Sequence, residues 1–551
     1  MFGQKLIYFF IAAAAFTTTS LATPDRLKVT VTPLNDAAFS VSVTFAGDAD
    51  GSTRLILPNE WGGQSELFRS IRSISVQPAS AKISDTDLPY VKLVTHKAGE
   101  KLTVLYEVVR DFQGKFRNEV RYRPVVDKGY IHWIGNTVFV LPDWKDEAEL
   151  DVSLEWKDLP GGWTTAHSFA TGKRTKRFTA ALGELRASIM VAGDFRIAST
   201  RAAGKPVDVA IRGKWAFTDT ELAEMVRKVI ETEREFWKDH SQDRYLVTLV
   251  PIDEGPNAMS FGGTGLTDSF ALFATPNATV DRLRGLLAHE YAHNWIPGKL
   301  GRMPKPEQEL YWFSEGFTEF YTYRLLAAGG LITRAELVAR YNELILEYYM
   351  LPVRTASNER IVKDFWSDRN VQRLPYLRGF LFATNLDAEI KRATDGKASL
   401  DDAVHELFSA SKKTPQPLSF GSLEALFTKY LGRDAGPMIR QHLVDGELIV
   451  PLPDALGADV SQNTVQTPVF ELGFDFDKLA KDRIVAGVDP NSSAYAAGLR
   501  NGQHRTAGFS LRFGDTATEI ELKVKDQEGE KTVKFLPVAR ERMAVPQYSL
   551  R

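Results

Sequence analysis

The feature that most constrains the fold is the stretch His289-Glu290-Tyr291-Ala292-His293. Residues four apart lie one above the other on a single face of an α-helix, so a helix here directs both imidazoles toward one point. Glu290 follows the first histidine and is free to face a water molecule held at that point. This spacing is typical of a zinc hydrolase, with His289 and His293 as metal ligands and Glu290 as the general base.

The flanking sequence supports a helix through this stretch. Val280, Leu283, Leu286 and Leu287 recur at helical spacing before the motif, and Pro297-Gly298 ends the pattern after it. With 9 histidines in 551 residues, chance would produce the pattern only about 0.01 times. The motif is therefore a candidate active site rather than a coincidence of composition.

A catalytic zinc ion needs a third protein ligand and an open coordination position. Glu315 and Glu319 lie downstream, on one face of a second expected helix among aromatic residues. A carboxylate in such surroundings is costly unless it is paired or bound to a metal. We assign Glu315 as the third ligand of one zinc ion per chain, and Glu319 as the carboxylate that holds a ligand histidine. The alternative for Glu319 is an ordinary solvated helix residue.

Two segments resemble the gluzincin metallopeptidases, most closely the glycyl aminopeptidase family: HEYAHNW at 289–295 and WFSEGFTEFY at 312–321. PYLRG at 375–379, followed by LDAEI at 386–390, resembles the tyrosine segment of that family, and 394–402 resembles the turn and helix start after it. The resemblance is strongest between residues 245 and 410. It implies a thermolysin-like, mainly helical catalytic domain that hydrolyses peptides, with Tyr376 donating a hydrogen bond to the oxyanion of the tetrahedral intermediate.

The chain departs from these relatives where aminopeptidases of the clan use a glutamate to hold the substrate's free α-amine. Depending on the alignment, Ser260 or Thr267 stands in that place. Asp268 is the expected replacement anchor, with Asp253-Glu254 as another carboxylate source. The resemblance implies an aminopeptidase acting on peptides with small N-terminal residues. The missing glutamate predicts a weaker preference for free N-termini, and the alternative is an endopeptidase or a hydrolase of blocked peptides.

The chain is long enough for several domains, and its patterning predicts a multidomain α+β protein. Residues 23–205 are expected to form an N-terminal β-sandwich-like domain, in which His96, His132 and His167 lack ligand spacing and are interpreted as structural. The expected strands are Leu27–Val31, Phe39–Phe45, Thr103–Val109 and Thr137–Leu141.

Helical periodicity begins at Thr218, and residues 206–456 are expected to form the catalytic domain. The strand Tyr245–Val250 precedes the motif, and we expect it to be the sheet edge along which an extended peptide lies.

Residues 457–468 are interpreted as a linker, and 469–551 resemble a PDZ domain. Leu472-Gly473-Phe474 looks like its carboxylate-binding loop, whereas Gly502-Gln503-His504-Arg505 departs from its usual continuation. Two other function classes follow: a PDZ-type peptide-binding protein with a vestigial metal site, and a zinc hydrolase of some other amide. A protein that had lost its catalytic activity would have no physical reason to retain the full set of site residues. This argues against the peptide-binding protein with a vestigial metal site.

Residues 1–22 have the pattern of a secretory signal peptide, with Lys5, an apolar core and a small-x-small site that predicts cleavage after Ala22. The apolar run is too short for a comfortable membrane span, so no stable anchor is expected after cleavage. The chain has no cysteine, which excludes disulfides and a cysteine nucleophile, and its net charge of −2 gives no reason to expect nucleic acid as a partner. We expect export to a bacterial periplasm or the cell exterior, with peptides as substrates.

Overall fold

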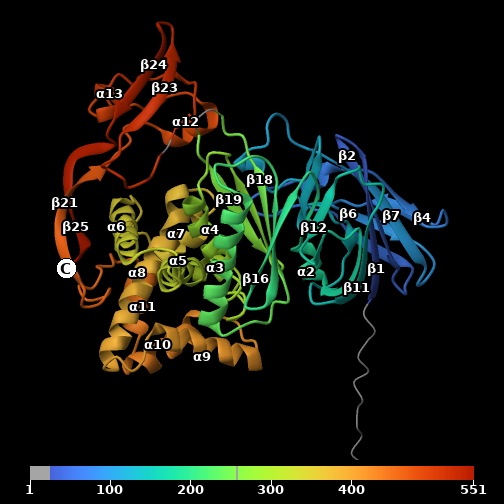
Figure 1. Cartoon of the computed structure of the whole chain (residues 1–551), viewed down its shortest axis with the longest axis horizontal. Coiled ribbons are helices and arrows are strands. Elements are labelled where there is room, and N and C mark those ends of the chain that lie inside the picture. Colours follow the sequence, from blue (N-terminus) through green and yellow to red (C-terminus); the bar gives the residue numbers. More distant parts are fainter. Residues whose placement is uncertain (1–24, 256–257, 510) are drawn as a thin grey trace, which may run out of the picture.

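The computed structural model describes residues 25–255, 258–509 and 511–551. The expected signal peptide, residues 1–22, lies outside these residues. The protein is a multidomain α+β structure in which a β-rich N-terminal region, a largely helical catalytic region and a C-terminal module follow one another along the chain (Figure 1). Within the described ranges, no helix is both long enough and apolar enough to cross a membrane.

The N-terminal region is mostly β-structure. Its elements are β1 (Asp25–Asn35), β2 (Ala38–Ala46), β3 (Ser52–Ile56), η1 (Leu67–Ser70), β4 (Ile71–Gln77), β5 (Lys82–Asp85), β6 (Val91–Thr95), β7 (Lys101–Val109), η2 (Asn118–Val120), β8 (Val125–Asp127), β9 (Tyr130–Ile134), α1 (Gly135–Val138), β10 (Leu141–Pro142), β11 (Glu149–Trp156), β12 (Thr164–His167), β13 (Ala170–Thr171), β14 (Thr175–Ala181), α2 (Leu182–Arg186) and β15 (Ile189–Gly193). They form a six-stranded sheet (β14-β11-β1-β2-β7-β4), a five-stranded sheet (β13-β12-β15-β9-β8) and a four-stranded sheet (β10-β3-β6-β5). Inward-facing apolar side chains of these sheets share one core, as in a sandwich.

Three of the four strands expected in this region are confirmed, because β1, β2 and β7 contain them. The strand expected at Thr137–Leu141 was wrong. The chain turns there as α1, with the Phe139 N–H donating to the Gly135 carbonyl at 2.9 Å. The Thr137 hydroxyl also donates to the Ile134 carbonyl at 2.8 Å. Such local bonds offer the backbone an alternative to a sheet ladder.

The five-stranded sheet is covered on both faces, so β9 and β15 are buried at every residue. Trp133 and Met190 face the sandwich core, whereas Ile134 and Val191 pack on the sheet of the catalytic region. Burial lowers the pKa of His132 and of His167 to about 3, so both imidazoles are neutral. These two histidines therefore lie in the packed interior, as their lack of ligand spacing indicates.

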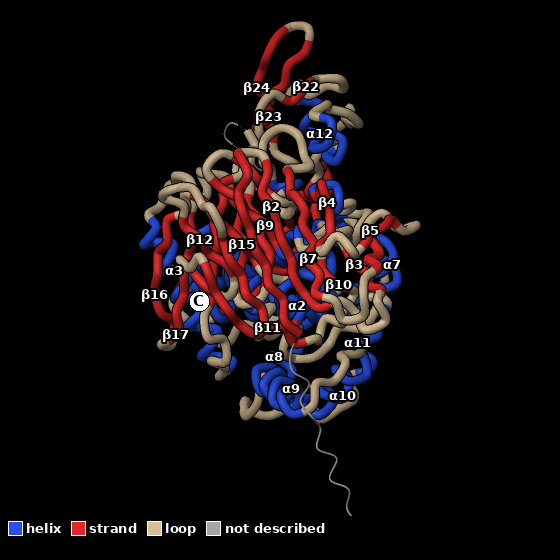
Figure 2. The backbone as a smooth tube through the Cα atoms, turned by 90° about the vertical axis from the view of Figure 1, so that its right-hand side faces the viewer, coloured by secondary structure: helices blue, strands red, loops and turns tan. Residues whose placement is uncertain are grey.

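The catalytic region combines one sheet with a group of helices. Its elements are β16 (Arg196–Ala202), β17 (Lys205–Ile211), α3 (Asp219–Trp237), β18 (Tyr245–Pro251), β19 (Phe261–Leu266), β20 (Ser269–Ala274), α4 (Val280–Ala292), η3 (Glu307–Leu310), α5 (Tyr311–Ala328), α6 (Arg334–Met350), α7 (Asn358–Asp364), α8 (Arg369–Ala393), α9 (Leu400–Lys413), α10 (Phe420–Leu431), α11 (Gly436–Ile439) and η4 (Arg440–Val444). The sheet order is β16-β17-β18-β20-β19, so the sheet begins upstream of residue 205. Figure 2 shows the strand-rich side of the molecule, where strands of the N-terminal region face the viewer, with β16 and β17 at the left and α9 and α10 at the lower end.

The edge strands of this sheet are β16 and β19, and the expectation that Tyr245–Val250 forms an edge was wrong. That segment is β18, which pairs in parallel with β17 on one side and with β20 on the other. Its backbone groups are therefore already used within the sheet. β19 pairs with β20 alone, in antiparallel register, and leaves its other edge toward the catalytic helices.

The catalytic helices pack closely where two glycines meet. A Cβ atom on Gly379 of α8 would lie 1.9 Å from the Trp312 carbonyl oxygen, and one on Gly316 of α5 would lie 2.3 Å from the Gly379 Cα atom. Only glycine permits this approach of α5 and α8. It brings the segment of α8 that contains Tyr376 against the helix that contains Glu315.

The C-terminal module contains β21 (Val460–Phe470), α12 (Phe476–Asp482), α13 (Ser493–Ala496), β22 (His504–Arg505), β23 (Ile520–Asp526), β24 (Gly529–Phe535) and β25 (Val538–Leu550). Gly457–Pro468 was expected as a linker, and this was wrong, because β21 pairs with β25 along its length. The β21–β25 ribbon lies along α6, where Asn342 binds the Tyr548 backbone through its side-chain amide at 2.7 and 2.8 Å (Figure 1). The rest of the module has its own small apolar core.

Candidate metal centre and catalytic cleft

Three side chains from α4 and α5 converge on one point. His289 lies in the last turn of α4, His293 caps that helix, and Glu315 lies in the second turn of α5. The Glu315 Oε2 atom is 3.4 Å from His289 Nε2 and 3.4 Å from His293 Nε2. Two ligand atoms about 2.0–2.1 Å from a tetrahedral ion are about 3.4 Å apart, so this donor set fits zinc.

The other ring nitrogen of each histidine is also engaged. His289 Nδ1 lies 3.1 Å from Glu319 Oε2, and His293 Nδ1 lies 2.7 Å from the Ile296 carbonyl oxygen. Both partners are acceptors, so each Nδ1 carries the proton. The lone pair of each Nε2 is then left facing Glu315 and the shared point, as a metal ligand requires.

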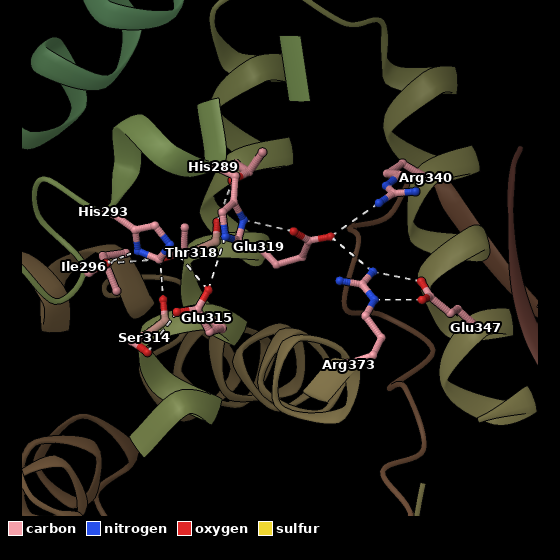
Figure 3. A network of polar contacts seen from close by, with 11 residues as sticks. His289, His293, Ile296, Ser314, Glu315, Thr318, Glu319, Arg340, Glu347 and Arg373 are labelled. Carbon is pink, nitrogen blue, oxygen red and sulfur yellow. Dashed lines mark hydrogen bonds and ion pairs between the residues drawn. The ribbon is translucent and has the colours of Figure 1, made fainter. Parts of the chain in front are cut away.

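Glu319 is itself held by two arginines of neighbouring helices (Figure 3). Its Oε1 atom is 3.4 Å from Arg340 Nη2 on α6 and 3.8 Å from Arg373 Nη2 on α8. Arg373 also forms a two-pronged pair with Glu347 at 2.7 and 2.8 Å. Burial alone would raise the pKa of Glu319, but the His289 hydrogen bond and these charges lower it to about 2. Glu319 is therefore an anion at neutral pH.

The electrostatics of the cluster favour a cation. In the metal-free cluster, burial alone would lower the pKa of His289, but its hydrogen bonds to Glu315 and Glu319 raise it to about 10, so that a bound cation would take the place of the Nε2 proton. The two histidines in turn hold the pKa of Glu315 well below its usual value. Positive charge at the shared point is thus stabilised by two buried carboxylates.

Glu290 lies between the metal cluster and the edge strand. Its Oε2 atom accepts a hydrogen bond from the Gly265 N–H of β19 at 3.1 Å. The N-terminal region holds the same strand, because the Tyr122 hydroxyl donates to the Gly263 carbonyl at 2.6 Å. The carboxylate of Glu290 therefore faces the place where a substrate backbone would run along β19.

Tyr376 lies on α8, opposite the strand. Its ring stacks on the His289 imidazole with centroids 5.8 Å apart. Burial, followed by the nearby Glu315 and Glu290 carboxylates, raises the pKa of Tyr376 well above its usual value. The phenol therefore stays protonated and can donate a hydrogen bond.

A cavity of about 680 Å³ connects these groups, within the about 300–1,000 Å³ typical of small-molecule sites. His289, Glu290, Glu319 and Tyr376 all line it. Four of the six residues that the sequence singled out for chemistry, from α4, α5 and α8, thus line the same cavity, whereas His293 and Glu315 are not among its lining residues.

The three residues expected to bind the substrate amine lie elsewhere. Ser260 pairs through its backbone with Thr275, at 2.8 and 3.1 Å. The Thr267 hydroxyl donates to the Glu184 carbonyl at 2.9 Å, and Asp268 accepts from Gln242 Nε2 at 2.9 Å. Among the described residues that line the 680 Å³ cavity, none of these three is present.

Sequence reasoning missed the residues that support Glu319. Arg340 and Glu347 lie on α6, far from the motif in sequence, and no local pattern marks them. Arg373 lies three residues before Tyr376, next to a segment that the sequence analysis had singled out. That proximity to Tyr376 is the only sequence feature that could have marked Arg373 as a residue of the site. Gly265 was equally unmarked, because it acts through its backbone N–H.

Comparison with protein families matches residues 282–372 to the M61 glycyl aminopeptidase family. No curated protein sequence matches the chain. Among solved structures, an aminopeptidase N family protein from Idiomarina loihiensis is similar over 95% of this chain and 98% of that one, with 17% identity and a TM-score of 0.71. An M1 zinc metallopeptidase from Deinococcus radiodurans aligns over 78% of this chain and 95% of that one, with 18% identity and a TM-score of 0.48.

The structural match to the Idiomarina protein shows a shared fold. The family match covers both histidines, Glu290, Glu315 and Glu319, and ends just before Tyr376. In the structure, His289, His293 and Glu315 form a group able to hold a metal ion. Together the family match and this donor set identify an enzyme, a zinc metallopeptidase.

Proposed function

We propose that this protein is an exported zinc-dependent aminopeptidase that acts on peptides with small N-terminal residues. His289, His293 and Glu315 would hold one zinc ion per chain. The observation that carries the proposal is the 3.4 Å spacing of their donor atoms, beside a cavity that Glu290 and Tyr376 also line.

Zinc, when bound, supplies Lewis acidity that polarises the scissile carbonyl and acidifies a water molecule. Glu290 takes the proton of the attacking water and then delivers it to the leaving amine. Tyr376 donates its hydroxyl proton in a hydrogen bond to the oxygen on which negative charge develops. The N–H and C=O groups of β19 pair with the extended substrate backbone.

A second candidate function is hydrolysis of internal bonds or of N-terminally blocked peptides. It is favoured by the position of Asp268, whose carboxylate is engaged by Gln242 outside the cavity lining. Ser260 and Thr267 offer a substrate ammonium only neutral hydrogen bonds. A buried carboxylate would discriminate more strongly, because a competitor without the amine leaves that charge unpaired.

One peptide with a free and with an acetylated N-terminus separates the two functions. If acetylation lowers kcat/KM by 100-fold or more, about 2.7 kcal/mol, the enzyme recognises the free α-amine of its substrate and is an aminopeptidase. A loss of only a few-fold supports the second candidate. Zinc bound to the purified chain together with hydrolysis of either peptide argues against a peptide-binding protein with a vestigial site.

We also propose that residues 1–22 are removed on export to a bacterial periplasm or the cell exterior, and that 469–551 form a PDZ-like module. The sequence of the signal segment supports the first, and the Leu472-Gly473-Phe474 loop supports the second. N-terminal sequencing of the mature protein tests the first, because cleavage after Ala22 gives a chain that begins at Thr23. An uncleaved chain would contradict it.

A further inference from the structure

The C-terminal module forms part of the wall of the catalytic cavity. Arg512 lies on the loop between β22 and β23 and lines the same cavity as Glu290 and Tyr376. Its Nη1 atom donates to Glu343 Oε1 of α6 at 2.7 Å. Gly514 has a φ of 83° and lies so close to α6 that a Cβ atom there would come within 2.9 Å of the Glu347 Cα atom. This loop therefore contacts α6 in two ways, through the ion pair between Arg512 and Glu343 and through its backbone at Gly514.

Arg282 of α4 lies beside Arg512. Both line the catalytic cavity, and both line a neighbouring cavity of about 200 Å³. Phe261, at the start of the edge strand β19, lines the catalytic cavity with them. The two arginines are thus brought to one end of the cavity from segments far apart in the sequence.

The other arginines of the cavity are occupied by carboxylates of the protein. Arg340 and Arg373 bind Glu343 and Glu347 at 2.7–2.9 Å, and Arg284 pairs with Asp281 at 3.2 Å. In contrast, no carboxylate of the described residues lies within 4.0 Å of Arg282. Arg512 contacts Glu343 through one nitrogen, and 44% of its side chain stays exposed.

We propose that Arg282 and Arg512 together bind a carboxylate group of the substrate at this end of the cavity. A guanidinium presents its N–H groups as a planar fork that matches the two oxygens of a carboxylate. The proposal rests on the peptidase function proposed above and names its substrate class. A peptide whose N-terminus lies toward the β19–β20 turn extends toward Phe261, and so toward the two arginines. The volume of the cavity suits short peptides, whose C-terminal carboxylate then lies within it.

The carboxylate has two chemical sources, the C-terminus and an acidic side chain, and three versions of one tripeptide separate them. The first has a free C-terminus, the second a C-terminal amide, and the third an amide with aspartate in place of the last residue. We expect the wild-type enzyme to cleave the acid roughly 10–100-fold more efficiently than the amide, because hydrogen bonds between charged groups are the strong ones. Recovery of efficiency with the third peptide identifies an acidic side chain as a source, and no recovery identifies the C-terminus alone.

Two variants on different elements test the residues. Arg512→Gln and Arg282→Gln should each bring the acid-to-amide ratio of kcat/KM toward one. Arg540→Gln, an exposed arginine of β25 in the same module, is the matched control and should keep the ratio of the wild type. Equal cleavage of all three peptides by the wild type overturns the proposal, and so does an unchanged ratio in both variants. A wild-type enzyme that cleaves none of the peptides would instead contradict the peptidase function itself.

Discussion

The two walls of the catalytic cleft are built in different ways. The helix wall, formed by α4, α5 and α8, presents side chains, and those of the metal cluster are held by further contacts, as Glu319 is by Arg340. The strand wall, formed by β19 and its turn to β20, is rich in glycine and presents mainly backbone groups. A hydrogen bond from the Gly265 N–H to Glu290 links it to the helix wall.

This difference separates the chemistry from the recognition of substrate. Metal binding and proton transfer need side chains fixed within a fraction of an ångström, which the packed helix wall provides. A strand edge recognises an extended peptide through its main chain, and such pairing gives affinity with little dependence on sequence. Selectivity is then left to residues at the ends of the cleft.

The largest effect is expected at Glu290, where the two walls meet. Glu290→Gln keeps an acceptor for the Gly265 N–H but loses the general base, so kcat should fall roughly 10²–10⁴-fold. Zinc content should stay at the wild-type value, because Glu290 is not a ligand. Steady-state kinetics and metal analysis of the same preparation measure both. Loss of zinc together with activity would show that Glu290 belongs to the metal site instead.

Tyr376 tests whether the helix wall also stabilises the transition state. Tyr376→Phe keeps the ring that stacks on His289 and removes the hydroxyl, so kcat should fall roughly 10²–10³-fold with KM little changed. The raised pKa of Tyr376 means that the phenol should remain a donor across the neutral range. A kcat near that of the wild type would make Tyr376 a packing residue.

Glu319 tests the support behind the metal ligands. Glu319→Gln retains an acceptor for His289 Nδ1 but removes the buried negative charge, so zinc affinity should fall roughly 10–100-fold. Competition with a zinc-binding dye measures the change. Glu336→Gln is the matched control, because Glu336 lines the same cavity but caps α6 through Thr333. Equal losses in both variants would indicate a general loss of charge rather than support of His289.

The smallest effect is expected on the strand wall, at Asp268. Its carboxylate is bound by Gln242 and lies outside the cavity lining, so Asp268→Asn should change the ratio of free to acetylated peptide cleavage less than about threefold. A hydrogen bond to a charged group contributes about 1.5–3 kcal/mol to stability, and asparagine keeps an acceptor oxygen for Gln242, so the variant should also fold. A 100-fold change in that ratio would restore Asp268 as the amine anchor.

The helix wall was predictable from the sequence because its signals are local. Two histidines four apart, and two glutamates four apart, define their faces of α4 and α5 without reference to the rest of the chain. Arg340, Glu347 and Arg512 gave no such signal. They reach the cleft through the packing of α6 and of the C-terminal module, which sequence spacing does not encode.

The substrate-binding edge was predicted on the wrong strand, and the amino-acid composition of the two strands explains why. Tyr245–Val250 reads YLVTLV, a nearly continuous apolar run, which is typical of a parallel strand buried on both faces rather than of an edge. The true edge, β19, reads FGGTGL, and glycine has low strand propensity. The Gly457–Pro468 segment was misread in a similar way, because β21 is stabilised by its distant partner β25, which itself lies along α6, rather than by its own apolar pattern.

The most direct test of the metal centre is anomalous diffraction at the zinc edge from crystals of the purified protein. One peak per chain is expected, about 2.0–2.2 Å from His289 Nε2, His293 Nε2 and a carboxylate oxygen of Glu315. A peak at another place, or a Glu315 carboxylate more than about 4 Å from the ion, would contradict the assignment, because a zinc–oxygen bond is about half that length.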